Sequence, residues 1–234
     1  MHMGFLITPK LDTVSIVLRG TFNPAIFSPY WFEKYKIIAS KAEDADVQLI
    51  HPEVVSFRTD WLSLSSDKNS FTIATSEAPW VRCLDLVEQT FGDFLSHTPI
   101  TQLGINRNIE FPSTMEKNEV VGHLLAPKKP WGDWGSQISK GVAGNHGGMR
   151  NVTMEIRDLE DREKGHVRAS VSPSEGNNHG VVVSINDHYE FSNVLSDSTL
   201  GATQAMETLS QNFMASMDRS ASITNQVMKL IDEA

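Results

Sequence analysis

The eight histidines of this chain have the widest range of chemistry, because imidazole titrates near neutral pH and binds transition metals. No two of them lie four residues apart, and the sequence contains neither an HExxH nor a CxxC motif. A zinc site needs three or four convergent protein ligands, which a pair such as Asp187-His188 does not supply. The sequence therefore predicts no metal site and no cofactor. The histidines are His2, His51, His97, His123, His146, His166, His179 and His188.

Two segments, 145–148 and 177–180, combine histidine with asparagine and glycine. Backbone amides in such segments can bind an oxyanion or a phosphate. One hypothesis is therefore a hydrolase that uses His146 or His179 together with a nearby carboxylate. The alternative is that Asn and Gly only provide the positive φ angles of ordinary turns. We favour turns and assign no catalytic residue.

An arginine interrupts the apolar side of the stretch 102–111, which otherwise alternates as a half-buried strand does. A charge that lines a cleft is a sign of a binding site. The second hypothesis is therefore a small anionic ligand in a cleft between sheet and helix, with Arg107, Asn106 and His146 as ligand-binding candidates. The alternative is that Arg107 and Glu110 protect an edge strand from unwanted pairing.

Trp131 and Trp134 lie in the segment 126–148, which has many glycines and no periodicity. A connection of this length without secondary structure is often functional. Trp is enriched at protein interfaces, so we predict a contact surface made of Trp131, Trp134, Lys128 and Lys129. The alternatives are that both indoles are buried in the core, or that they stack on nucleic acid beside the lysines.

The single cysteine, Cys83, excludes an intrachain disulfide and favours a reducing cytoplasm. It lies on an expected amphipathic helix, where it is interpreted as a small buried apolar residue rather than a nucleophile.

The net charge of −9 and the pI near 5.3 argue against nucleic acid as a partner. No run approaches 18 apolar residues, and residues 1–10 do not resemble a signal peptide. We expect no membrane partner.

Alternating stretches and amphipathic helices follow one another in the same order twice. The first half predicts a strand at 13–19, a helix capped by Ser28, an extended stretch within 47–57 that Pro52 interrupts, a hairpin over 61–75 and a helix from Pro79. The expected buried stripe of the helix after Ser28 contains Tyr30, Trp31, Tyr35 and Ile38.

The second half predicts the strand 102–111 and then a helix to Leu125 that begins with a Ser113–Glu116 capping box. Three strands follow, with inward residues at 152–156, 167–171 and 181–185. The last helix begins at Asp197 or Ser198 and should bend near 220–224, where helix formers are scarce.

This order predicts an α+β fold, a curved antiparallel sheet built from two β-α-β-β-β-α units with the long helices packed on one face. Residues 1–97 form the first unit and 98–234 the second, and both belong to one compact domain.

The sequence also resembles a sporadically distributed bacterial family of uncharacterised proteins of similar length. The shared features are the strand 14–18, the aromatic-Arg pair Phe57-Arg58 before a hairpin, the helix from Pro79-Trp80, the stretch Leu103-Gly104-Ile105-Asn106-Arg107-Asn108 and the strand end Ser184-Ile185-Asn186-Asp187 before the last helix. In the family that stretch tends to read Leu-Gly-Leu-Arg-Tyr-(Ile/Val)-Asn-Arg, so this copy is shorter. The resemblance implies no reaction and no site residue.

The leading hypothesis is a non-catalytic binding or assembly protein of the cytoplasm. It acts through protein–protein contacts, either with a protein partner or by self-association into a homo-oligomer, as a subunit of a bacterial multi-protein system. The surface that makes these contacts is the segment 126–148.

Overall fold

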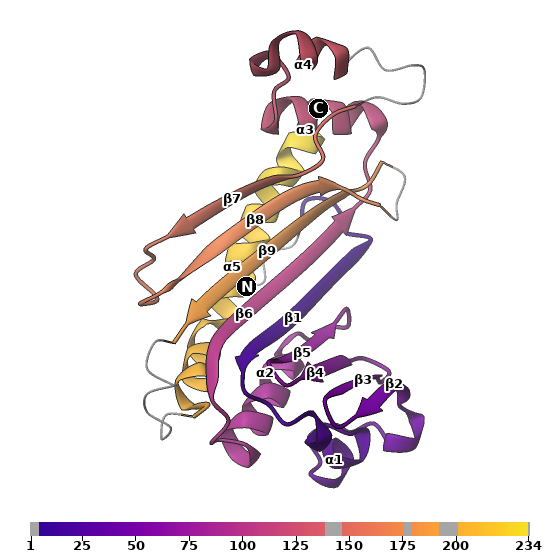
Figure 1. The fold of residues 1–234 in the computed structure, drawn as a ribbon. Helices are drawn as coiled ribbons and strands as arrows, with labels where there is room; N and C mark the ends of the chain where they lie inside the picture. Colours follow the sequence, from indigo (N-terminus) through magenta and orange to yellow (C-terminus); the bar gives the residue numbers. More distant parts are fainter. Residues whose placement is uncertain (1–4, 139–146, 176–178, 192–200, 234) are drawn as a thin grey trace.

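A single antiparallel sheet of nine strands organises the chain in the computed structural model, which describes residues 5–138, 147–175, 179–191 and 201–233. The strand order is β2-β3-β4-β5-β1-β6-β9-β8-β7, and every neighbouring pair is antiparallel (Figure 1). The strands are β1 (Leu11–Gly20), β2 (Asp46–His51), β3 (Val54–Arg58), β4 (Ser63–Asp67), β5 (Ser70–Thr75), β6 (Ile100–Phe111), β7 (Val152–Arg157), β8 (Gly165–Pro173) and β9 (Val181–Glu190).

Helices occupy the ends of the sheet and one of its faces. The helices are α1 (Pro29–Lys34), α2 (Val81–Glu88), α3 (Met115–Leu125), α4 (Gly132–Ile138) and α5 (Thr203–Asp232). A π-helical segment, η3 (Gln89–Phe94), continues α2, and three short 3-10 turns are η1 (Pro24–Ile26), η2 (Ala42–Asp44) and η4 (Lys129–Trp131). The predicted fold class, α+β with one antiparallel sheet, is confirmed.

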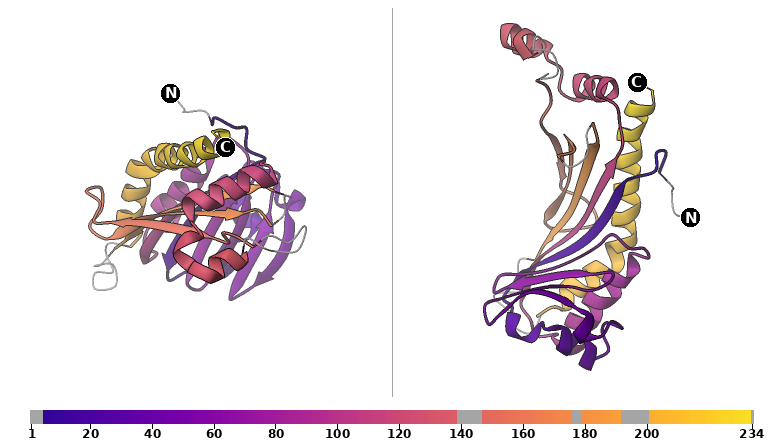
Figure 2. Two further views of the ribbon diagram at one scale, coloured as in Figure 1. Left: turned by 90° about the horizontal axis from the view of Figure 1, so that it is seen from above. Right: turned by 90° about the vertical axis from the view of Figure 1, so that its right-hand side faces the viewer.

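The sheet is bent, and the long helix α5 lies along one of its faces (Figure 2). The alternation predicted for 13–19 places Val14, Ile16 and Leu18 on the helix side, where all three are fully buried. Two apolar clusters fill the space under the helices. The cluster under α2 is rich in aromatic side chains, with Phe71 in edge contact with Phe27 and Phe91. Each such side chain contributes about 1.5–3 kcal/mol by burial.

The helix α5 spans both clusters, because its apolar stripe is 30 residues long. Leu209 and Phe213 belong to the first cluster, and Met228 and Ile231 belong to the second. The helix is continuous through residues 220–224, where the sequence predicted a bend. Of the three hydroxyl residues in this stretch, Ser220 and Thr224 are buried, and Ser220 accepts a hydrogen bond from Arg107 of the sheet.

The first half differs from its prediction in two places. The stretch 47–57 forms two strands, β2 and β3, where one was counted, because the chain reverses at 52–53, the place of the predicted interruption at Pro52. The helix α1 has only six residues, with Ser28 as its cap as predicted. Its predicted stripe is therefore partly wrong, since Tyr30 and Tyr35 are exposed whereas Phe32 and Ile38 are buried.

Candidate functional site

The helices α3 and α4 project beyond one end of the sheet, next to the C-terminal end of α5 (Figures 1 and 2). We call residues 115–138 the knob. Thr114, not the predicted Ser113, caps α3, since its hydroxyl accepts a hydrogen bond from the amide of Lys117 at 3.3 Å. The ammonium of Lys117 donates to the carbonyl of Ile231 at 2.8 Å and so ties α3 to α5. Val121 is the one buried residue of α3.

The segment 126–148 was predicted to lack secondary structure, and this prediction is wrong for its first half. Residues 129–138 form η4 and α4. The glycines that suggested a loop instead allow tight packing: a Cβ on Gly135 would lie 2.1 Å from the carbonyl oxygen of Lys128. Gly132 takes a φ of +58°, which glycine adopts without strain. Residues 139–146 lie outside the described part.

Trp131 and Trp134 lie on the surface of the knob, where 60% and 56% of their areas are exposed. Their ring centroids are 5.2 Å apart with an interplanar angle of 66°, an edge-to-face contact. The alternative that both indoles are buried in the core does not agree with these exposures. Of the two lysines predicted with them, Lys129 is exposed and Lys128 is partly buried.

Apolar side chains of α3, the other helix of the knob, are also exposed. Val120 is 39% exposed and Leu124 is 55% exposed, and their spacing of four residues places them on one face of the helix. We call Val120, Leu124, Trp131 and Trp134 the knob surface. Single exposed apolar residues are common, whereas two exposed indoles in mutual contact are a candidate contact site.

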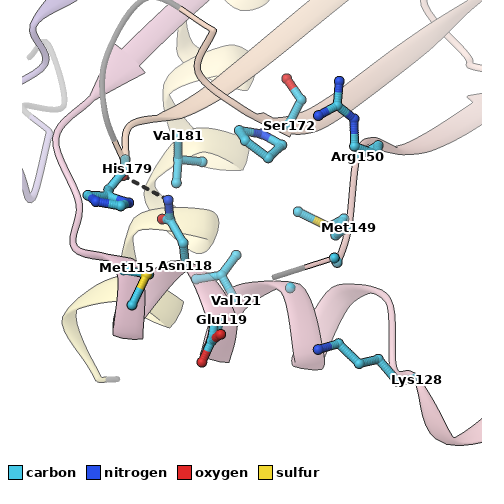
Figure 3. Close-up of a pocket in the computed structure, with 14 residues that line it drawn as sticks. Met115, Asn118, Glu119, Val121, Lys128, Met149, Arg150, Ser172, His179 and Val181 are labelled. Carbon is cyan, nitrogen blue, oxygen red and sulfur yellow. Dashed lines mark hydrogen bonds between the residues drawn. The ribbon is translucent and has the colours of Figure 1, made fainter. Parts of the chain in front are cut away.

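A pocket of about 390 Å³ lies between α3 and the neighbouring ends of β8 and β9 (Figure 3). Val121, Val181 and Met149 provide apolar walls, and Lys128 and Arg150 line the pocket from opposite sides. Neither cation has an ion pair with a described residue. The amide nitrogen of Asn118 donates to the carbonyl of His179 at 2.8 Å, whereas its buried Oδ1 has no hydrogen-bond partner among described groups.

The histidine candidates for hydrolysis do not form a site within the described residues. His146 lies outside them. His179 has a φ of +63° and takes part through its backbone carbonyl, which agrees with the turn interpretation. No hydrogen bond joins its imidazole to a carboxylate in the part of the chain that the structure describes.

Arg107 and Asn106 lie on opposite faces of β6, because neighbouring strand residues alternate, so one ligand cannot contact both side chains. The guanidinium of Arg107 forms two hydrogen bonds with the carboxylate of Asp12, at 2.9 and 2.7 Å. It also donates to the carbonyl of Met217 and to the hydroxyl of Ser220, both at 3.3 Å. These contacts give Arg107 a structural role, and its predicted role as an anion ligand stays a prediction.

The sequence did not reveal a second charged group, which joins the β7–β8 hairpin to α5. The carboxylate of Asp187, 1% exposed, accepts from Arg162 at 2.6 Å, from Arg219 and from the hydroxyl of Ser216 at 2.7 Å. Arg162 also forms hydrogen bonds with Asp161 at 2.7 and 2.8 Å. The negative charges of the two carboxylates are therefore balanced by the positive charges of the two guanidinium groups. We call Asp161, Arg162, Asp187 and Arg219 the buried charge cluster, after the buried side chains of Arg162 and Asp187 at its centre; Asp161 and Arg219 are partly exposed.

The pKa values in this cluster reflect burial and pairing. Burial alone would lower the pKa of Arg162, but hydrogen bonds with Asp161 and Asp187 outweigh it and raise that pKa. The same hydrogen bond with Arg162, followed by that with Arg219, lowers the pKa of Asp161. Burial raises the pKa of the adjacent Tyr189 to about 12. All these shifts keep the ordinary protonation states, so the cluster is suited to holding structure rather than to proton transfer.

Cys83 is fully buried, and burial raises the pKa of its thiol to about 12. A nucleophilic cysteine needs a lowered pKa, so this position does not favour thiolate chemistry.

Within the described residues, no three His, Cys, Asp or Glu side chains are grouped as metal ligands would be. Nor does any helix of that part have the length and apolar character needed to cross a membrane.

Comparisons with known protein-family models and with curated proteins give no match for this chain. Its function must therefore be inferred from the geometry of the knob and the pocket themselves.

Proposed function

We propose that this chain is a non-catalytic assembly protein that binds a protein partner through the knob surface. The observation that carries the proposal is the exposure of Trp131 and Trp134, 60% and 56%, side by side on the projecting knob. We place this activity in the cytoplasm, where the single thiol stays reduced. The resemblance to a bacterial family stays a prediction, as does membership of a multi-protein system.

The physical reason for placing the contact at the tryptophans is the binding free energy gained when an indole ring is buried. A tryptophan buries about 150–250 Å² in a contact, and Trp is among the side chains that dominate binding energy at interfaces. Val120 and Leu124 add apolar area beside the pair, and the exposed Lys129 adds a charge at the rim. Charged rims exclude water from such a centre and set the partner's orientation.

The test compares three baits in affinity capture from cross-linked source cells: the unmodified chain, a Trp131→Ala/Trp134→Ala variant and a Tyr30→Ala variant. Tyr30 is the matched control, because it is an aromatic residue 68% exposed on α1, far from the knob. We expect a partner that the unmodified chain and the control retain and the double variant loses. Identical sets of proteins on all three baits would contradict the proposal.

A second candidate function is the binding of a small anionic ligand, which the pocket of Figure 3 favours more than Arg107 does. Lys128 or Arg150, both without an ion-pair partner among described residues, would hold the negative group. The buried Oδ1 of Asn118 would accept a hydrogen bond that it lacks at present. Unsatisfied buried acceptors are costly, so a ligand donor there would contribute to affinity.

A thermal-shift screen with nucleotides and acidic metabolites tests this second candidate. We expect that a ligand raising the midpoint of the unmodified chain has no effect on Lys128→Ala or Arg150→Ala. Lys129→Ala is the control, because Lys129 is exposed and does not line the pocket. A screen without any stabilising compound would contradict this function and leave the protein-contact proposal standing.

We also propose that the sheet consists of the two units predicted from the sequence, 1–97 and 98–234. The support is the strand order, in which β1 and β6 pair at the centre and each continues outward with the last strand of its own half, β5 or β9. The first half has one strand more than the proposed β-α-β-β-β-α unit, because β2 and β3 replace one predicted strand.

A further inference from the structure

The edge strand β7 has no neighbour on its outer side among the described residues. It is the last strand of the sheet order and pairs only with β8. Met154 is 71% exposed and Ile156 is 56% exposed. An edge of this kind presents unpaired N–H and C=O groups that can pair with another strand.

The exposed apolar residues of β7 continue the core of the protein. Ile156 pairs with Val167, and Val152 pairs with Val171, so these residues share the helix side of the sheet. Val167 and Val171 are buried under α5, at 4% and 7% exposure. On β7 the same apolar row is uncovered, because it lies beyond the helix at the margin of the sheet.

The opposite edge, β2, is built differently. Its pairing with β3 shifts between Val47 and Leu49, which is a β-bulge or irregularity. Bulges twist an edge and block its pairing with other chains. The pairing of β7 has no such shift over its six residues. The chain thus interrupts one edge and leaves the other regular.

We infer that the β7 edge binds the β7 edge of a second copy, antiparallel, with Met154 opposite Met154 of that copy. In this register Val152 lies opposite Ile156, so the apolar row of one copy meets the apolar row of the other. On the other side Glu155 lies opposite Thr153. Cross-strand apolar pairs stabilise an antiparallel ladder, and no like charges face each other.

Side-chain charge favours this register over the two registers that are shifted by two residues in either direction. A shift of two residues in one direction places Glu155 opposite Glu155, which is destabilising. A shift in the other direction pairs fewer residues and places Ile156 opposite Arg150.

The resulting dimer has a two-fold axis perpendicular to the sheet, so both α5 helices lie on the same face of one continuous sheet. A six-residue ribbon buries less than the roughly 1,200 Å² of a standard interface. We therefore expect a dimer that dissociates on dilution. The dimer does not use the knob surface, so it goes beyond the proposed function and can fail or hold independently of it.

Sedimentation equilibrium over a range of concentrations tests the dimer. We expect a monomer–dimer equilibrium for the unmodified chain and an association at least about tenfold weaker for Ile156→Lys. Ile50→Lys is the control, because Ile50 has the same 56% exposure and lies on the other edge. Trp131→Ala/Trp134→Ala should dimerise normally. A monomer at every concentration, or equal weakening by Ile50→Lys, would overturn the inference.

Cysteine cross-linking tests the register. Opposed residues have Cβ atoms about 4.5–5.5 Å apart, close enough for a disulfide after small adjustments. The native Cys83 is fully buried and does not compete. With an added oxidant that takes up the two electrons and two protons, Met154→Cys should form a linked dimer, whereas Ile156→Cys should link much more slowly because it faces Val152. Equal linking of both variants would overturn the register.

Discussion

At the scale of single residues, the buried charge cluster is the feature with the largest expected energetic effect. Asp187 is almost completely removed from water, and hydrogen bonds from Arg162, Arg219 and Ser216 compensate for the lost hydration of its carboxylate. A buried ion pair contributes little net stability, but removing one partner leaves an uncompensated charge, which costs far more.

We therefore expect Arg162→Ala to lower the free energy of unfolding by about 3–5 kcal/mol, measured by denaturant titration. Arg157→Ala is the control, because the side chain of Arg157 is 66% exposed and its ion pair with Glu155 is superficial. It should cost less than about 1 kcal/mol. A loss for Arg162→Ala no larger than for the control would show that the cluster does not hold the hairpin to α5.

Asp161 should give the cluster a pH dependence. Its pKa in the folded chain is lowered, chiefly by the hydrogen bond with Arg162, below the value of about 3.9 expected when unfolded. The carboxylate therefore contributes stability that is present above the unfolded pKa and is lost as pH falls through the folded pKa. We expect Asp161→Asn to be less stable than the unmodified chain near pH 7, by a difference that shrinks below about pH 4. A difference independent of pH would exclude this origin.

At the scale of elements, the knob should open independently of the sheet. Among α3 residues only Val121 is buried, whereas β1, β6 and β9 form the centre of the sheet. Regions with few buried apolar contacts have low local stability.

Gly135→Ala should loosen α4 alone, because the added Cβ would lie 2.1 Å from the carbonyl oxygen of Lys128. We expect faster hydrogen exchange over 129–138 and unchanged exchange in β6, measured by mass spectrometry. Gly92→Ala is the matched control, since a Cβ there meets nothing within 4 Å. Unchanged exchange over 129–138 in Gly135→Ala would contradict the packing assigned to α4.

The elements also show what periodicity can and cannot predict. The strands β6, β7, β8 and β9 and the helix α5 are predictable from alternation and helical spacing, because burial on one face imposes those periods. The burial of Asp187 does not follow from the sequence pattern, although the residue continues the inward series Val183, Ile185, because an acid is not expected among buried strand residues. Its partners Arg162 and Arg219 lie 25 and 32 residues away in sequence, beyond what local patterns can pair.

Local patterns were least informative in the candidate site. Gly132 and Gly135 are typical of a loop, yet both belong to α4. Gly132 takes a positive φ, and Gly135 packs closely on the carbonyl of Lys128. Residue type alone singles out the two tryptophans as interface candidates, and the three-dimensional structure adds that both are exposed. Asn106 and Arg107 were grouped by sequence proximity, which the alternation of a strand makes misleading.

At the scale of the whole molecule, the knob and the β7 edge are two of the described regions that expose apolar side chains. We expect Trp131→Ala/Trp134→Ala to change the free energy of unfolding by no more than about 0.5 kcal/mol per site, as exposed positions do. Denaturant titration against Phe213→Ala, a fully buried residue, provides the scale. A loss comparable to that of Phe213→Ala would mean that the indoles stabilise the fold rather than bind a partner.

The most direct test of the central claim is hydroxyl-radical footprinting of the knob, read by mass spectrometry in the purified chain and in extract of source cells. We predict strong oxidation of Trp131 and Trp134 in the purified chain and protection of both in the extract, with Tyr30 labelled equally in the two samples. Equal oxidation of both tryptophans in the two samples would contradict the claim that this protein acts through a partner bound at the knob.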